Sequence, residues 1–271
     1  MNMNDIEKNG LVLLGCGKMG SAMLKGWLDG GLPPASVWVS DPNPSDWLVG
    51  IKGLNLNTDL PSAPAVVLVA VKPQMMADAL PTLAAMGNGE TLFISVAAGI
   101  TIATYEELLG SRTPIVRAMP NTPAAVGRGI TAIIGNGLAT ADHAELAEAL
   151  LSSVGQVVRL DSEDQMGAVT AISGCGPAYT FHLIEAMAAA GTAKGLNPDL
   201  ALTLARATVA GAGHLAENSE EDPSQLRVNV TSPNGVTQAA LEVLMSDSDG
   251  FPPLLLRAVE AAINRDRELG E

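Results

Sequence analysis

Three glycines near the start of the chain have the spacing of a phosphate-binding turn. A short apolar run over residues 11–14 leads into Gly15, Gly17 and Gly20, which form the pattern G-x-G-x-x-G. In such a turn the first glycine permits a tight bend, the second lets backbone approach a pyrophosphate, and the third lets the next helix pack closely. The N–H groups at the start of that helix attract the phosphates. The segment therefore predicts a dinucleotide site at the start of the chain.

A carboxylate follows at the distance that a dinucleotide-binding unit requires. A helical run and a second apolar strand follow the turn, and Asp41 comes directly after them, 21 residues beyond Gly20. An acid at this place bonds the adenosine ribose of NAD. Asp41 would repel the 2′-phosphate of NADP, and no arginine follows it before Lys52, which favours NADH. Ser40 and the shape of the loop could still accommodate the phosphate, so the choice of cofactor stays open.

Two polar segments in the second half of the chain are further candidates for chemistry. Residues 173–179 separate two helical runs and contain Cys175, but no His or Asp lies nearby in the sequence to activate a thiol. Residues 231–237 form a turn that enters a helix, and the N–H groups of residues 234–237 could bind a carboxylate. An N-capped helix without a ligand is the plainer interpretation of that turn taken alone.

Neither a metal site nor a hydrolase nucleophile is expected. The three histidines, at positions 143, 182 and 214, are isolated, and the two cysteines lack the spacing of metal ligands. The region around Gly174 does not have the G-x-S-x-G arrangement after a strand that a hydrolase requires.

Composition limits the class of protein. The 271 residues are 47% apolar and 3% aromatic, which predicts an aliphatic core in one or two domains. The net charge of −14 and the lack of any Lys/Arg run argue against nucleic-acid binding. The apolar runs are too short to span a membrane. The two cysteines lie far apart in the sequence, so a disulfide framework is not expected, and we expect a cytoplasmic protein. The polar first ten residues are interpreted as a loose tail rather than a signal peptide.

The first part of the chain alternates apolar strands with helical runs. Such continuous apolar strands predict a parallel sheet covered on both faces, here a Rossmann-type doubly wound domain over residues 11–161. Ligands of such sheets bind beyond the carboxyl ends of the strands. Expected strands cover residues 11–14, 36–40, 64–71, 91–96, 114–118, 130–134 and 156–160.

The second part, residues 162–271, contains no convincing strand and is expected to be an all-helical domain. Its stretch 186–194 is small and apolar almost all round, which is typical of a helix buried on every side. A helical domain of this size rarely buries whole helices alone, so we expect it to pack against a second copy in a homodimer. A compact monomeric helical domain is the alternative.

Several separated segments together resemble pyrroline-5-carboxylate reductase, in order and spacing, from about Leu11 to Leu269. The most specific are Met-Pro-Asn-Thr-Pro at 119–123, Gly-Pro-Ala-Tyr at 176–179 and Thr-Ser-Pro at 231–233. The others are the glycine turn, Ala-Val-Lys-Pro at 70–73 and Ser-Val-Ala-Ala-Gly at 95–99. The resemblance implies reduction of 1-pyrroline-5-carboxylate to L-proline with NADPH or NADH, the last step of proline biosynthesis. It also implies an interlocked helical homodimer, which often assembles further into a decamer, a pentamer of dimers.

The resemblance also implies which residues form the site. The residues implied to contact the cofactor are Leu14, Gly15, Cys16, Gly17, Lys18, Met19, Asn57, Ala70, Val71, Lys72, Pro73, Ala97, Ala98 and Gly99. Ser40 and Asp41 are also expected to contact it, because of their position at the end of the second strand. From its sequence position alone, Lys72 could equally be a solvated cation. The residues implied to surround the substrate are Ser232, Asn234, Gly235, Val236 and Thr237. Thr237 takes the place of the threonine proposed to bond the ring nitrogen and is the expected catalytic residue.

Two departures from the family pattern and two rival functions remain. Asn234 stands where the family usually has glycine, but asparagine tolerates left-handed backbone, so the turn can survive. Cys175 replaces a common serine. A β-hydroxyacid dehydrogenase needs a lysine on its first interdomain helix, and residues 166–174 contain none. A non-enzymatic dinucleotide sensor or scaffold would bind the cofactor without oxidising it in response to a pyrroline.

Overall fold

The computed structural model describes residues 3–270, with side chains described for residues 3–268. Contacts divide the chain into two compact units. One runs up to Gly174 and resumes at Ala262; the other is Cys175–Ala261. The last strand ends at Arg159, and the later elements among the described residues are helical. The domain boundary expected after Asp161 rests on that change of secondary structure and stays a prediction.

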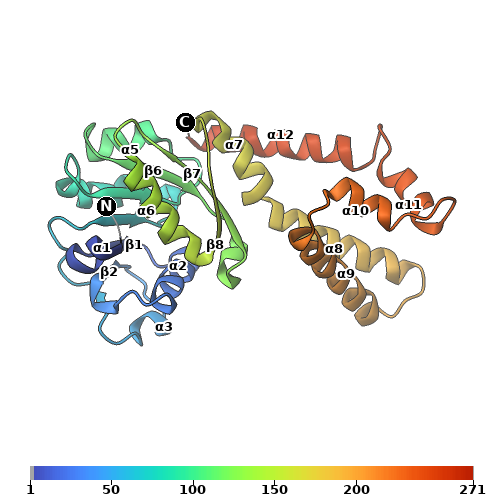
Figure 1. Cartoon of the computed structure of the whole chain (residues 1–271), viewed down its shortest axis with the longest axis horizontal. Helices are drawn as coiled ribbons and strands as arrows, with labels where there is room; N and C mark the ends of the chain where they lie inside the picture. Colours follow the sequence, from blue (N-terminus) through green and yellow to red (C-terminus); the bar gives the residue numbers. More distant parts are fainter. Residues whose placement is uncertain (1–2, 271) are drawn as a thin grey trace. The chain divides into compact units, whose positions relative to one another are not determined.

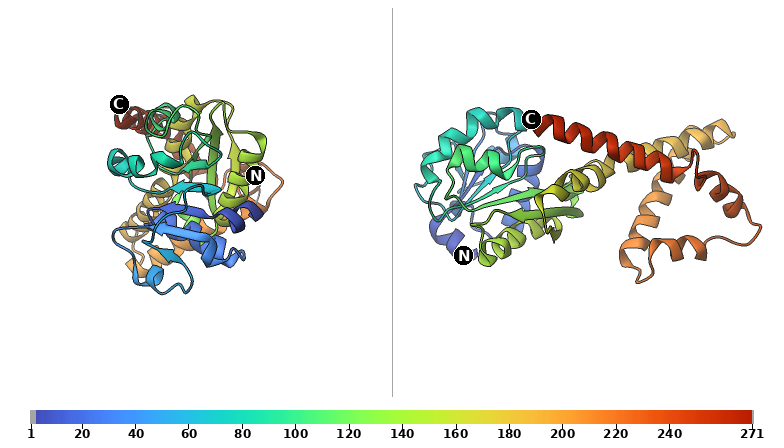
Figure 2. Two further views of the ribbon diagram at one scale, coloured as in Figure 1. Left: turned by 90° about the vertical axis from the view of Figure 1, so that its left-hand side faces the viewer. Right: turned by 90° about the horizontal axis from the view of Figure 1, so that it is seen from above.

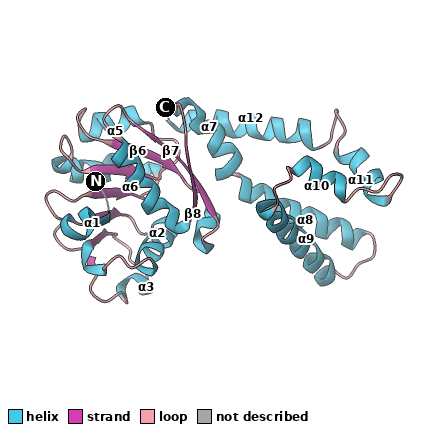
Figure 3. Ribbon diagram, viewed as in Figure 1, coloured by secondary structure: helices cyan, strands magenta, loops and turns pink. Residues whose placement is uncertain are grey.

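The first unit is built on an eight-stranded sheet (Figures 1 and 3). Its order is β3-β2-β1-β4-β5-β6-β7-β8, and the strands from β3 to β6 are parallel to their neighbours. The order reverses direction between β1 and β4, so a ligand is expected at the carboxyl ends of these two strands. The strands are Leu11–Leu14, Val37–Ser40, Asn55–Leu56, Val66–Val69, Leu92–Ser95, Ile115–Met119, Gly129–Gly135 and Gly155–Arg159.

The expectation of an entirely parallel sheet is wrong at one position. β7 runs antiparallel to β6, with Met119 opposite Ala132. Residues 120–128 join the two strands through a 3-10 turn, Thr122–Val126, which ends at Gly127 in left-handed backbone. A parallel connection needs a crossover of a dozen or more residues, so this short link can only return the chain in the opposite direction. β8 is parallel to β7.

Helices cover both faces of the sheet, as Figures 1 and 2 show, and each face has its own apolar core. On one face α2 (Lys18–Asp29) and α6 (Ala141–Leu151) bury Met23, Leu24, Trp27 and Leu150 against the strands. On the other, α4 (Met76–Ala79) and α5 (Ile102–Leu109) bury Met76, Tyr105 and Leu109. The short helix α3 (Asp46–Val49) lies between β2 and β3 in the chain. The two-sided burial explains why the central strands β1, β4 and β5 are apolar at nearly every position.

The start of the chain is not the loose tail that its polarity suggested. Residues Met3–Asn9 form α1, and Ile6 is fully buried in the core with α2. The helix stops at Gly10, whose N–H donates to the Ile6 carbonyl at 2.8 Å and whose φ is +94°. A single buried isoleucine anchors an otherwise polar segment, and one residue is too weak a signal for a periodicity argument.

The second unit is entirely helical and buries little of its own surface. α8 and α9 pack side by side, and Ala201 and Ala205 of α9 are the only buried side chains among residues 175–261. α8 carries nearly all of the small, mostly apolar stretch 186–194, yet no residue of α8 is buried within the single chain. The first unit ends with α7 (Met166–Val169) and the π-helical turn after it. The helices of the second unit are α8 (Gly176–Ala193), α9 (Pro198–Asn218), α10 (Pro223–Asn229), α11 (Val236–Leu244) and the first part of α12 (Phe251–Gly270), whose residues from Ala262 on are assigned to the first unit.

Large apolar side chains are exposed throughout the second unit. Val236 is 91% exposed, Val243 71% and Phe181 61%. Such an apolar surface is typical of a unit that is completed by a partner. Among the described residues, no helix combines the length and the apolar character needed to cross a lipid bilayer.

Candidate active site

The glycine turn has the backbone geometry that its sequence predicted. Gly15 directly follows β1 with a φ of +85°, a conformation that favours glycine. A Cβ added to Gly20 would lie 2.5 Å from the Gly15 carbonyl oxygen, so only glycine lets α2 approach the turn this closely. Gly17, the N-cap of α2, has no such neighbour: a Cβ there would meet no atom within 4 Å. The turn is therefore closed around Gly15 and Gly20 and open at Gly17.

The helix that follows this opening is not capped by a side chain. Gly17 forms no side-chain cap, and no acidic residue lies in the first turn of α2. The N–H groups at the start of a helix have no partner within it and carry a partial positive charge. Gly17 thus combines open space with backbone donors, which is the arrangement that binds a phosphate group.

Asp41 is joined to the glycine turn by a direct hydrogen bond. The Cys16 N–H donates to Oδ2 of Asp41 at 2.6 Å, and the Asn43 N–H donates to Oδ1 at 2.8 Å. Asn57 holds the Asp41 backbone from the other side, accepting from its N–H at 2.9 Å and donating to its carbonyl at 2.8 Å. The Gly15 N–H donates to the Ser40 carbonyl at 2.8 Å. The ends of β1, β2 and β3 are therefore locked together around the turn.

The remaining expected cofactor residues lie after β4 and β5. The Ala70 N–H donates to the Leu14 carbonyl, and Gly15 lies against Ala70 and Val71, so this segment borders the turn directly. Ala97, Ala98 and Gly99 follow β5, the next strand of the sheet. The structure thus brings the whole expected cofactor set to one edge of the first unit. Lys72 is exposed at this edge.

Cys16 lies in the turn with its side chain buried. Burial raises the pKa of its thiol; the hydrogen bond with Ser21 partly opposes this rise, and the nearby Asp41 carboxylate adds a smaller increase. A thiol with a raised pKa is a poor nucleophile at neutral pH. Its contribution to the turn is therefore its backbone N–H, not its sulfur.

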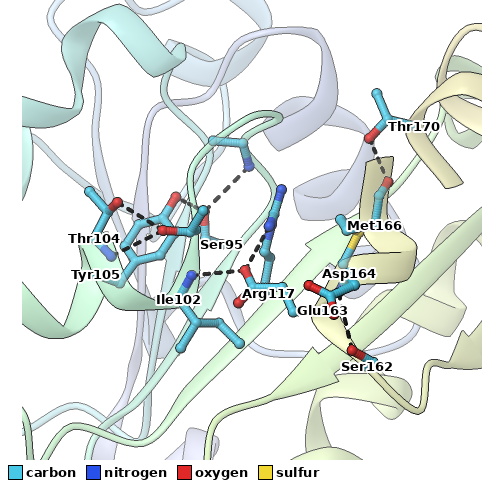
Figure 4. Close-up of polar contacts among 12 residues, drawn as sticks. Ser95, Ile102, Thr104, Tyr105, Arg117, Ser162, Glu163, Asp164, Met166 and Thr170 are labelled. Carbon is cyan, nitrogen blue, oxygen red and sulfur yellow. Dashed lines mark hydrogen bonds and ion pairs between the residues drawn. The ribbon is translucent and has the colours of Figure 1, made fainter. Parts of the chain in front are cut away.

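A buried ion pair beside this edge was not foreseen from the sequence. Nη1 of Arg117 on β6 donates to Oε1 of Glu163 at 2.6 Å, and the Arg117 side chain is only 6% exposed (Figure 4). The same Oε1 accepts from the Ile102 N–H at 2.9 Å. Ile102 is the first residue of α5, so Glu163 satisfies both a buried cation and the start of a helix. Arg117 could have been singled out in the sequence, because it is a charged residue inside an otherwise apolar strand. No feature of the sequence marks Glu163, 46 residues later, as its partner.

The loop after β5 is held at both of its ends, as Figure 4 shows. At one end Oγ of Ser95 accepts from the Ala97 N–H at 3.3 Å and is also hydrogen-bonded to the Tyr105 hydroxyl. Burial is the main reason that the pKa of Tyr105 rises to about 12, so the phenol stays protonated. At the other end the Glu163 contact holds Ile102. Residues 97–101, which include three expected cofactor contacts, are thereby fixed in position.

A cavity of about 580 Å³ adjoins this loop within the first unit. Its walls include Gly99, Arg117, Glu163, Met166 and Asp266. Burial raises the pKa of Asp266, partly offset by the positive charge of Arg117. The cavity is large enough for a small ligand or part of a larger one.

The segment Met-Pro-Asn-Thr-Pro has a structural role that its sequence did not reveal. The side chain of Asn121 accepts from the Ile130 N–H at 3.0 Å and donates to the Ser173 carbonyl at 3.1 Å. Ser173 belongs to a π-helical turn, Thr170–Gly174, that separates α7 from α8. Asn121 therefore joins the start of β7 to the point where the helical runs were predicted to break.

The expected substrate residues lie in the second unit, at the start of α11. Asn234 has a φ of +54°, so asparagine does adopt the left-handed backbone expected of it there. The turn itself uses two of its N–H groups: that of Asn234 donates to Oε1 of Gln238 at 2.7 Å, and that of Gly235 donates to the Ser232 carbonyl at 3.0 Å. The N–H groups of Val236 and Thr237 begin α11 and have no partner within the helix.

The described part of the chain contains no cluster of three or more His, Cys, Asp or Glu side chains placed to hold a metal ion. Cys175 directly precedes α8 and is half-buried. The pKa of Tyr179 is raised mainly by burial and further by the neighbouring Cys175 thiol.

Two family models match the chain. Residues 163–269 match the model described as pyrroline-5-carboxylate reductase dimerisation, and residues 10–99 match the one described as NADP oxidoreductase, coenzyme F420-dependent. The first covers the helical part of the chain and the second covers the glycine turn and the strands around it.

Individual relatives match over nearly their whole length. Pyrroline-5-carboxylate reductase of Pseudomonas aeruginosa is 39% identical over 96% of this chain and 97% of its own, and that of Pisum sativum is 40% identical over 96% and 95%. The solved pyrroline-5-carboxylate reductase of Coxiella burnetii is 34% identical, with a TM-score of 0.90 over 97% of this chain and 99% of its own. The Plasmodium falciparum pyrroline carboxylate reductase, solved with NADP bound, is 30% identical, with a TM-score of 0.83 over 98% and 99%. This chain belongs to the pyrroline-5-carboxylate reductase family.

Proposed function

We propose that this protein reduces 1-pyrroline-5-carboxylate to L-proline with NADPH or NADH, the last step of proline biosynthesis. The observation that carries the proposal is the turn at Gly17, where open space and uncapped helix N–H groups meet at the edge where the sheet order reverses. A dinucleotide fits this edge on steric and electrostatic grounds. The proposed reaction is that of the family to which the chain belongs.

The chain's own residues would hold the cofactor in three groups. The turn at residues 14–19 receives the pyrophosphate, Ser40, Asp41 and Asn57 receive the adenosine ribose, and residues 70–73 and 97–99 border the nicotinamide half. When bound, the cofactor supplies the hydride. The hydrogen bonds at Ser95 and Ile102 keep the loop after β5 in one position, which favours a fixed nicotinamide geometry.

The turn at residues 232–237 is proposed to bind the substrate, and to do so at the cofactor edge of the partner chain. The N–H groups of Val236 and Thr237 receive the substrate carboxylate, because the turn already engages those of Asn234 and Gly235. The Thr237 hydroxyl orients the ring nitrogen. A protonated imine is electrophilic already, so the enzyme needs no strong acid and contributes mainly by positioning.

The homodimer is part of the proposal. A surface as apolar as that of residues 175–261 is completed by a second copy of the same surface in a two-fold dimer. Residues 162–271 are proposed as the dimerisation and substrate domain, and 11–161 as the cofactor domain. We further propose that five such dimers assemble into a decamer. The two free cysteines are in keeping with a cytoplasmic location, which is also part of the proposal.

One assay separates the proposed enzyme from the rival interpretation as a sensor or scaffold. The absorbance of NADH or NADPH is followed with the purified protein, with and without 1-pyrroline-5-carboxylate. We expect oxidation of the dinucleotide that depends on the pyrroline and yields proline in equal amount. Dinucleotide binding without pyrroline-dependent oxidation would instead identify a sensor.

Thr237→Ala is expected to lower kcat about tenfold to a hundredfold, the value of one hydrogen bond made in the transition state. Dinucleotide affinity should not change, because Thr237 belongs to the proposed substrate turn. Thr237→Ser keeps the hydroxyl and serves as the matched control, with most of the activity retained. Unchanged steady-state kinetics in Thr237→Ala would remove this residue from the mechanism.

A further inference from the structure

Asp41 is held at the glycine turn more rigidly than a surface carboxylate ordinarily is. Oδ2 accepts from the Cys16 N–H at 2.6 Å and Oδ1 from the Asn43 N–H at 2.8 Å, so the carboxylate cannot rotate away without losing a hydrogen bond. Hydrogen bonds to an ionised carboxylate are among the stronger ones in proteins. The negative charge is therefore fixed beside the backbone that would receive the cofactor.

The backbone of Asp41 is fixed as well. The Asn57 side chain accepts from the Asp41 N–H and donates to the Asp41 carbonyl, forming a two-bond clamp from the neighbouring strand end. Asn57 adopts a φ of +53°, a conformation that asparagine tolerates better than most residues. A loop shift that carries the charge away from the site would break this clamp and the two carboxylate bonds together.

No basic side chain in the segment that follows β2 offsets the negative charge of Asp41. Residues 42–51 contain no Lys or Arg. A fixed carboxylate accepts hydrogen bonds from both hydroxyls of an adenosine ribose, whereas a 2′-phosphate in the same place brings like charges together. Proteins that accept the phosphate place an arginine nearby.

From this geometry we infer that Asp41 makes the protein select NADH over NADPH. The inference deepens the proposed function, since it concerns the same cofactor edge. Selection arises from a charge that the fold prevents from moving, and it acts on dinucleotide binding before any reaction step. It assigns to Asp41 the role of a specificity-determining residue.

The test is direct titration of the full-length protein with NADH and with NADPH, by calorimetry or cofactor fluorescence, without pyrroline present. We expect NADH to bind at least about tenfold more tightly. Asp41→Asn, which removes the charge and keeps the size of the side chain and one of its two acceptor oxygens, should tighten NADPH binding about tenfold while changing NADH affinity less. Asp46→Asn removes an equal charge from the same segment and should leave the ratio of the two affinities unchanged.

Several outcomes would overturn the inference. Equal or tighter binding of NADPH by the unaltered protein would do so, as would an Asp41→Asn variant that weakens or strengthens both cofactors alike. Because the titration contains no pyrroline, an NADH preference would stand even if the reductase assay failed. Equal binding of both cofactors with an active reductase would overturn this inference alone, and binding of neither would overturn the proposed function with it.

Discussion

Gly17→Val is expected to weaken dinucleotide binding about a hundredfold while leaving the protein folded, because it would cost the pyrophosphate one or more charge-assisted hydrogen bonds to the turn. A Cβ at this position would meet no protein atom within 4 Å, and Gly17 has an ordinary φ of −69°, so we expect the fold to accept the side chain. The space that it fills is the space proposed for the pyrophosphate. The affinity is measured by titration, and folding by circular dichroism and thermal unfolding.

Two other glycines provide the controls for that experiment. Gly137 also has open space around it, but it lies in the turn after β7, so Gly137→Val should keep both its fold and its cofactor affinity. Gly20→Val should fail to fold stably, because its Cβ would lie 2.5 Å from a backbone oxygen. Normal dinucleotide affinity in Gly17→Val would show that the ligand does not occupy this turn.

Glu163→Ala is expected to lower the free energy of unfolding by about 3 kcal/mol, because it leaves the Arg117 guanidinium buried without its counter-ion. The Arg117 side chain is 6% exposed and that of Glu163 is 30% exposed, so the low end of the range for buried pairs applies. The Ile102 N–H would also lose its acceptor. The measurement is denaturant unfolding at one fixed protein concentration, because dimerisation makes stability depend on concentration.

A double variant separates the buried charge from the other effects of that change. Arg117→Met with Glu163→Gln removes both charges and keeps an acceptor for the Ile102 N–H, so it should be less destabilised than Glu163→Ala alone. A loss below about 1 kcal/mol in Glu163→Ala would mean that the pair behaves as an exposed one. The proposed fixation of the loop after β5 would then have no energetic basis.

The elements around the cofactor edge could be predicted because their signals are local. Apolar runs predicted the strands on either side of the glycine turn, and the roles of Gly15 and Gly20 followed from spacing alone. The left-handed backbone at Asn234 was also foreseen, since it depends on one residue type. These features need no knowledge of distant parts of the chain.

The features that were missed depend on partners far away in the sequence. Arg117 and Glu163 meet only because β6 and the segment after β8 approach one another in the folded sheet. The antiparallel direction of β7 follows from the length of the link before it, which periodicity does not report. The helix at Met3–Asn9 is anchored by one isoleucine, Ile6, which is buried in the same apolar core as the inward side chains of α2.

The most direct test of the proposed site is whether two impaired variants restore each other in one dimer. Gly17→Val impairs the cofactor turn and Thr237→Ala impairs the substrate turn. If each active site combines the two turns from different chains, co-expression of the variants should recover about a quarter of the wild-type activity, because half of the dimers are mixed and each has one intact site of two. If activity in the mixture does not exceed the average of the two variants alone, the site does not join the two chains and the proposed arrangement is wrong.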